Sequence, residues 1–297
     1  MEGLIHLDSL SLIIIFASIF LGSIIFSFSS RYLSKDKQKS WNIHLIVVII
    51  ASIFLAIADN IFLILLSYFI IKLPIMLCCR RARYIHIIST ILLAIALLIL
   101  YTQTGEGAIS KILRADVGSC FRTIASCFIL VSAMIQCGIF PFHKWLLSLL
   151  SVSTPMIAFI NGYIVAIGIF IIARFSEIFT KSYVVLIIGI MAAFIGMICM
   201  FMQSDVKSRL SFSTIANMGF ATALCGIGGF YLAVVFALLH GVFKTYLFLS
   251  SSTLSEFSTS NALVMKKSPK WVMYLYVKML NFSQPPLNNY SRKDDGK

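Results

Sequence analysis

The stretch HLIVVIIASIFLAIADNIFLILLSYFIIKLPIMLCC, from His44 to Cys79, decides the fold because it is apolar almost throughout. A helix that crosses about 30 Å of hydrocarbon needs roughly 20 apolar residues. This stretch is too long for one crossing, and a single helix would bury Asp59 in lipid. The triplet Ala58-Asp59-Asn60 is typical of a turn, so the pattern predicts two membrane helices joined tightly at that point.

The composition of the whole chain extends this interpretation. Of the 297 residues, 60% are hydrophobic and 12% are charged, and the mean hydropathy is +0.97. A water-soluble domain needs far more polar residues on its surface. We therefore expect an all-α integral membrane protein in the lipid bilayer, with about nine transmembrane helices. The expected spans are 10–28, 43–55, 61–79, 85–101, 123–140, 155–173, 183–202, 211–226 and 231–250.

The basic residues predict the orientation of the chain. There are 24 Lys and Arg against 11 Asp and Glu, and they lie in short clusters between apolar runs, which is not typical of a nucleic-acid-binding face. With nine spans, 18 of the cations fall on the side of the C-terminus, Lys72 counted as a loop residue among them, and 5 fall on the other side. Because cytoplasmic loops carry the excess of cations, we expect an N-out, C-in protein of the cell inner membrane.

Several classes of chemistry have no support in the sequence. The seven cysteines form no CxxC pair and have no histidine at zinc-site spacing, so we expect no metal site and no disulfide framework. Neither a nucleotide-binding glycine loop nor a nucleophile elbow is present, and we expect no cofactor. The first residues lack a basic region before an apolar one, which disfavours a cleaved signal peptide.

The chain divides by composition into two parts. Residues 1–252 hold all the apolar runs and form the predicted transmembrane domain. Residues 253–297 are polar and basic, with one moderately apolar patch at 271–282, and are predicted to be a cytoplasmic tail.

Two titratable side chains fall inside the last apolar run, FALLHGVFKTYLF, from Phe236 to Phe248. Lys244 follows His240 by four residues, so on a helix both lie on one face about one turn apart. A charge in a membrane span is costly, and Lys244 lies too deep to reach the interface easily. We therefore interpret the pair as a proton relay, and the alternative is a snorkelling lysine beside a histidine that a neighbouring helix satisfies.

Pro141 interrupts the fifth apolar run and predicts a broken helix, a feature frequent at transport sites. Residues 140–151 predict a short amphipathic helix, and His143 and Lys144 lie just after the break. The alternative, which we prefer for Lys144, is an interfacial loop that Trp145 anchors at the headgroups. Asp205 and Lys207 belong to the compact loop DVKSR, for which a solvated connection is the ordinary interpretation.

Four segments together resemble one superfamily: FPFHKWL, STPMIAFINGYIVAIGIFIIARF, SDVKSRLSFSTIANMGF and HGVFKTYLFLSSS. They are similar, in order and spacing, to the proton-conducting, antiporter-like subunits of respiratory complex I, of cation antiporters and of inorganic carbon pumps. The resemblance covers about residues 7–252. It implies an antiporter-like fold with the first inverted repeat and an incomplete second repeat.

The segment after Asn60 distinguishes the branches of this superfamily. Complex I chain 5 and the antiporters continue there with a Gly-Trp-Glu segment, whereas IFLILLSYFIIKLPIML has no glutamate. In this respect the chain is similar to the DabB-type subunits of inorganic carbon transporters. That resemblance implies a DabA-like partner with a zinc site of carbonic-anhydrase type, and a membrane subunit that passes H⁺ or Na⁺ and has no hydration chemistry of its own.

The resemblance also assigns pathway positions. His240 and Lys244 match the family, whereas Gln136 and Asn161 stand where the family has a lysine and a histidine. Pro141 and His143 belong to the broken-helix region. Two alternatives stay open: a proton-translocating subunit of a complex I-like, hydrogenase-linked or antiporter assembly, and a degenerate subunit that assembles without conducting.

Overall fold

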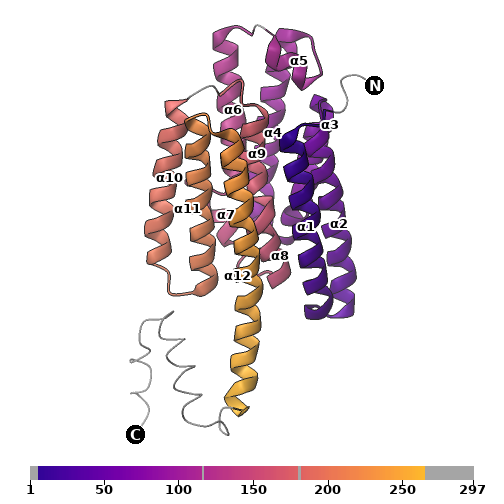
Figure 1. The fold of residues 1–297 in the computed structure, drawn as a ribbon, viewed down its shortest axis with the longest axis vertical. Helices are drawn as coiled ribbons and strands as arrows, with labels where there is room; N and C mark the ends of the chain where they lie inside the picture. The colour runs from indigo at the N-terminus through magenta and orange to yellow at the C-terminus, as the bar shows by residue number, and fades with distance from the viewer. Residues whose placement is uncertain (1–5, 116, 180–181, 265–297) are drawn as a thin grey trace. The chain divides into compact units, whose positions relative to one another are not determined.

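The computed structural model describes residues 6–115, 117–179 and 182–264, and these residues form helices and connections without a strand (Figure 1). The chain divides into two compact units, Met1–Ser251 and Ser252–Lys297. The predicted apolar patch at 271–282 lies outside the described residues. The all-α membrane fold predicted from the sequence is confirmed.

Nine long helical segments account for most of the first unit, and one of them, Thr154–Arg174, is made of three consecutive elements. The helices are α1 (Ser9–Tyr32), α2 (Lys35–Ile57), α3 (Ile61–Cys78), α4 (Arg80–Thr104), α5 (Ile109–Arg114), α6 (Ser119–Cys137), α7 (Lys144–Leu147), α8 (Thr154–Phe159), the π-helix η1 (Ile160–Ile164), α9 (Ala166–Arg174), α10 (Tyr183–Phe201), α11 (Val206–Gly226) and α12 (Phe230–Val264).

Eight of these segments are long and apolar enough to cross a membrane. The remaining predicted span, 211–226, corresponds to α11. This helix is regular and has 21 residues, but it is less apolar because Lys207, Arg209 and Asn217 belong to it. Its length and its extensive packing against α10 still agree with a crossing helix. The short helices α5 and α7 do not reach the length of a span.

The turn predicted between the second and third spans is confirmed. Helix α2 ends at Ile57 and α3 begins at Ile61. The side chain of Asn60 caps α3 by accepting a hydrogen bond from the backbone N–H of Phe62 at 2.8 Å. Asp59 accepts bonds from the backbone and hydroxyl of Ser110 at 2.9 and 2.6 Å, so the carboxylate is kept out of the hydrocarbon.

The broken helix near Pro141 is present, but the amphipathic helix predicted over 140–151 is wrong. Helix α6 ends at Cys137, and Gly138 takes the left-handed conformation with φ of 64°. Pro141 has no N–H to offer to a helical ladder. Turns therefore occupy most of this region, and only Lys144–Leu147 forms a helix, α7.

The sixth span lies at the centre of the first unit. All residues of Thr154–Arg174 are buried, whereas α10 is mostly exposed and faces outward. Helix α9 packs against α6 on one side and α11 on the other, and α6 packs in turn against α4 (Figure 1). The π-helix η1 interrupts this central span, which the sequence did not predict.

Candidate functional site

Lys244 is a buried ammonium inside the membrane bundle. Its side chain is 2% exposed, and Nζ donates a hydrogen bond to the backbone oxygen of Leu210 in α11 at 3.0 Å. Among the described residues, Lys244 forms no ion pair with a carboxylate. Because its Nζ bonds a neighbouring helix and does not reach the exterior, the interpretation as a snorkelling lysine is wrong for this structure.

His240 lies one turn before Lys244 on the same helix, as predicted. Its ring stacks on that of Phe236, with the centroids 6.3 Å apart. Its Nε2 is buried and has no hydrogen-bond partner among the residues that the structure describes. Buried polar atoms of this kind are ordinarily satisfied by water or a ligand, so the imidazole is available to exchange a proton.

Helix α12 meets the π-helix at two glycines. Gly241 lies against the backbone of Gly162, and the hydroxyl of Thr245 lies against Gly162 as well. Asn161, the residue before Gly162, donates from Nδ2 to the backbone of Ile157 at 3.1 Å. Asn161 Oδ1 and Thr245 Oγ1 are buried without a partner in the described part of the chain. The close approach therefore places neutral polar groups beside the turn that holds Lys244.

The other predicted pathway residues lie around the broken helix. Gln136 is buried in the last turn of α6 and donates from Nε2 to the backbone oxygen of Ile164 in η1 at 2.9 Å. His143 precedes α7, and its ring centroid lies 6.0 Å from that of Phe212 in α11. Gln136 thus contacts the π-helix, to which Asn161 belongs, while His143 lies beside the helix that accepts the Lys244 bond. Their role in conduction stays a prediction.

Asp205 and Lys207 are not part of this polar group. Asp205 caps α11 by accepting from the backbone and hydroxyl of Ser208 at 2.9 and 3.0 Å. Lys207 lies in the first turn of that helix and is partly exposed. The predicted loop is therefore wrong for residues 206–209, which begin α11, although the exposed Asp205 and the partly exposed Lys207 agree with a solvated position.

Lys72 was counted as a loop cation in the sequence, and this is wrong. It lies inside α3 and is fully buried. The last residues of the apolar run continue the helix past it to Cys78, even through Pro74. No pattern in the sequence shows its surroundings, because they come from α4 and α6.

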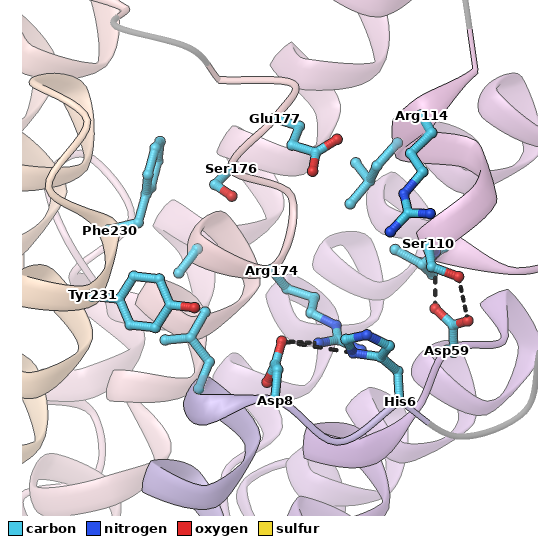
Figure 2. Close-up of a pocket in the computed structure, with 14 residues that line it drawn as sticks. His6, Asp8, Asp59, Ser110, Arg114, Arg174, Ser176, Glu177, Phe230 and Tyr231 are labelled. Carbon is cyan, nitrogen blue, oxygen red and sulfur yellow. Dashed lines mark hydrogen bonds and ion pairs between the residues drawn. The ribbon is translucent and has the colours of Figure 1, made fainter.

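A polar pocket lies at the end of the unit where α1 begins and α9 ends (Figure 2). Arg174 is 8% exposed and joins two parts of the chain there. Its Nη1 donates to Asp8 at 2.8 Å, and its Nη2 donates to the backbone oxygen of Ala58 at 3.0 Å. Asp8 also caps α1, since Ser11 donates to it from both N and Oγ at 2.7 Å. These contacts tie the first span to the second and sixth.

The charge state of Asp8 follows from these contacts. Burial raises the pKa of this carboxyl, but the hydrogen bonds from Ser11 and the charge of Arg174 outweigh burial and lower it below its ordinary value of 3.8. A carboxyl with a lowered pKa contributes stability that is fully present above the ordinary value and is lost as the pH falls through the folded-state value.

We expect Arg174→Gln to destabilise the protein by about 2 kcal/mol near pH 7, because it leaves a carboxylate and a carbonyl without their charged donor. Thermal unfolding in detergent measures the difference, which should shrink as the pH falls below the ordinary Asp8 pKa of 3.8. Lys111→Gln removes the exposed pair with Glu106 and is the control, expected to change stability by less than about 0.5 kcal/mol. Equal effects of the two variants would contradict the structural role of Arg174.

Fold and polar groups together define a class of protein: a multi-pass helical membrane protein with a broken helix and lysines buried in its bundle. Residues 60–295 match the family model described as NADH:quinone oxidoreductase/Mrp antiporter, transmembrane. The chain belongs to this family, and the predicted resemblance is confirmed. The match extends beyond Ser252, where the resemblance read from the motifs ends.

Curated relatives and solved structures agree with this family. The chain is 28% identical, over 92% of its length, to a protein of Bacillus anthracis named as the inorganic carbon transporter subunit DabB, and it spans 57% of that relative. It is 36% identical over 134 residues to DabB1 of Halothiobacillus neapolitanus, which is 44% of this chain and 24% of the relative. The Mrp complex of a Dietzia species has a chain with the same fold, at a TM-score of 0.76 and 23% identity over 82% of this chain and 29% of that one.

Proposed function

We propose that this chain is the cation-conducting membrane subunit of an inorganic carbon pump that works with a zinc-bearing, DabA-like partner. The observation that supports conduction is the buried Lys244, whose ammonium bonds the backbone of α11 and has no carboxylate partner in the described part of the chain. A buried lysine without a counter-ion gains little stability from its charge, and lysines change protonation state readily when buried. Proton transfer is the function that explains its place best.

The geometry around Lys244 supports a relay in which His240 and Lys244 exchange a proton. The two groups lie one turn apart on α12, and imidazole is the side chain whose ordinary titration lies nearest neutral pH. The carbonyl of Leu210 holds the ammonium while it carries the proton. Neutral groups such as Asn161 and Thr245 orient water beside the pair but do not titrate themselves.

The carbon-pump branch is supported by the curated relatives named DabB and by α3. That helix has no glutamate, whereas the complex I and antiporter branches have one in the corresponding segment. A cation antiporter or complex I-like subunit is the second candidate, and it is favoured by a relative of Staphylococcus aureus named as the antiporter subunit mnhA2, at 26% identity over 98% of this chain.

We infer an N-out, C-in orientation in the inner membrane from the distribution of cations. With the buried Lys72 removed from the count, 17 cations still belong to the side of the C-terminus and 5 to the other side. Impermeant maleimide added to intact cells is expected to label Cys120 and not Cys78, which are exposed at opposite ends of their spans. The reverse pattern would overturn the orientation.

Affinity purification of the tagged full chain from detergent-solubilised membranes tests the assignment of the complex. We expect a zinc-containing soluble protein to copurify with it, identified by mass spectrometry and by metal analysis. Copurified iron–sulfur or quinone-binding subunits would assign the chain to the respiratory branch, and further antiporter subunits would assign it to the antiporter branch. Recovery of the chain alone, still folded, would overturn the two-subunit proposal.

A further inference from the structure

A second buried lysine lies in a different part of the bundle. Lys72 in α3 is 0% exposed, and its Nζ donates to Ser89 Oγ at 2.8 Å and to Thr90 Oγ1 at 3.4 Å. The same Nζ lies 3.4 Å from the centroid of the Tyr68 ring, a cation–π distance. Among the described residues, no ion pair reaches it.

The groups around Lys72 form one hydroxyl cluster that joins three helices. Tyr68 of α3, Ser89 of α4 and Ser132 of α6 lie within hydrogen-bond distance of one another, at 3.2 and 3.3 Å from the Tyr68 hydroxyl and 3.1 Å between the serine hydroxyls. Ser132 Oγ also donates to the backbone oxygen of Ser89 at 2.7 Å. The cluster solvates the ammonium with neutral dipoles and places no negative charge beside it.

One titratable side chain faces Lys72 from α4. His86 lies one turn before Ser89 and Thr90, so all three share a helix face. It is 0% exposed, and Thr90 donates to its backbone oxygen at 3.0 Å. Neither ring nitrogen has a hydrogen-bond partner among the described residues. A histidine placed only to be structural would have its ring nitrogens bonded, so these two are free for proton exchange.

His86 lies one side chain away from a pocket beside α7. Its ring packs edge-on against Trp145, with the centroids 4.4 Å apart. Trp145 donates to the backbone oxygen of Ile135 at 2.8 Å, which fixes its position at the end of α6. Trp145 also lines the pocket, together with Ile85, Lys144, Leu147 and Ser148. The Trp145 indole therefore lies between the pocket and His86.

We propose that His86 and Lys72 form a second proton-loading site, filled from the pocket beside α7. A hydronium ion that enters from the pocket past the indole protonates one imidazole nitrogen and leaves as water. The proton on the other nitrogen passes to the uncharged Lys72 amine, which becomes an ammonium, and His86 returns to a neutral tautomer. The inference rests on the proposed function, since loading has a purpose only where the chain passes protons.

The other groups that face this site are few. On α3 itself the facing group is Tyr68, whose ring the ammonium contacts. Helix α2 also packs against α3, and its lysines, Lys35, Lys37 and Lys39, lie in its first turns and are exposed. Burying an ammonium among neutral groups is costly, and an apolar side chain of similar length would fill the space without that cost. Proton transfer, and not a gain in stability, therefore explains why a lysine occupies this position.

The test compares Lys72→Met with Lys37→Met, a change of an exposed lysine, in the purified complex reconstituted into vesicles with a pH-sensitive dye. We expect Lys72→Met to lower proton flux about 100-fold, the usual contribution of a proton-transfer group. Its melting midpoint should stay unchanged or rise. Unchanged flux would overturn the inference. A loss of flux no larger than the loss of folded protein would also overturn it, because Lys72 would then have only a structural role.

Two further variants keep the inference falsifiable. Lys72→Arg retains the charge but does not release its proton, so we expect it to be folded and slow, and full flux through it would count against the site. His86→Gln should change the dependence of flux on pH relative to the parent chain, because it removes the titratable group that passes the proton to Lys72. If Lys244→Met stops flux while Lys72→Met does not, only this inference fails. If neither changes it, the proposed function fails as well.

Discussion

We expect Lys244→Met to lower ion flux about 100-fold or more while the protein stays folded, because it removes the proton-carrying group and leaves its helix intact. The methionine fills the buried space between α12 and α11. The hydrogen bond to Leu210 is lost, but that carbonyl also accepts from Thr214 at 3.1 Å and so is not left unpaired. Flux into vesicles that contain the purified complex, measured for protons and for Na⁺ in separate samples, gives the result and the coupling ion.

A matched control for this variant lies on the same helix. Phe243 is 57% exposed and points away from the polar group, so Phe243→Met should conduct as the parent does. His240→Gln is expected to be intermediate, since it removes one partner of the relay and keeps Lys244. Normal flux through Lys244→Met would eliminate the relay and support the alternative of a subunit that assembles without conducting.

The spans could be predicted from the sequence because each depends on local composition. The turn at Ala58–Asn60 was also predictable, since a carboxylate followed by asparagine is costly in hydrocarbon and typical of a tight connection. The structure shows what stabilises the carboxylate in this turn. Ser110 donates two hydrogen bonds to Asp59 from about fifty residues away, and it lies in the short helix α5, which the sequence did not predict.

Lys72 shows what the local pattern does not contain. Its neighbours Ser89 and Ser132 are unremarkable serines in apolar runs, and only the packing of α3, α4 and α6 brings them together. The predicted third span, 61–79, already included Lys72, whereas the count of cations placed it in a loop. The structure agrees with the span, because Lys72 lies six residues inside a helix that ends at Cys78.

The π-helix at Ile160–Ile164 was equally absent from the sequence pattern. It adds one residue to a helical turn, and neither hydropathy nor periodicity registers so small a change. Its location at Asn161 fits the tendency of π-helices to occur at functional sites. The sequence therefore indicated candidate pathway residues, whose role stays a prediction, but provided no indication of the π-helix that holds Asn161.

We expect Gly241→Ala to destabilise the protein by about 3 kcal/mol, the upper range for overpacking, because the added carbon would meet the backbone of Gly162. A side-chain tip could move aside, but here the obstacle is the π-helix inside the fully buried central span. Melting in detergent and the yield of monodisperse protein measure the loss, and yield changes severalfold for a destabilisation of this size.

The control is Gly107→Ala, where the nearest atom, Nδ2 of Asn60, lies 3.9 Å from the added carbon. It should melt as the parent does. The contrast with Lys244→Met separates architecture from conduction: the lysine variant is expected to fold and fail to conduct, whereas the glycine variant is expected to fail at folding. If Gly241→Ala melts normally, α12 does not approach the π-helix as described, and Thr245 and Asn161 lose the contact that places them beside the relay.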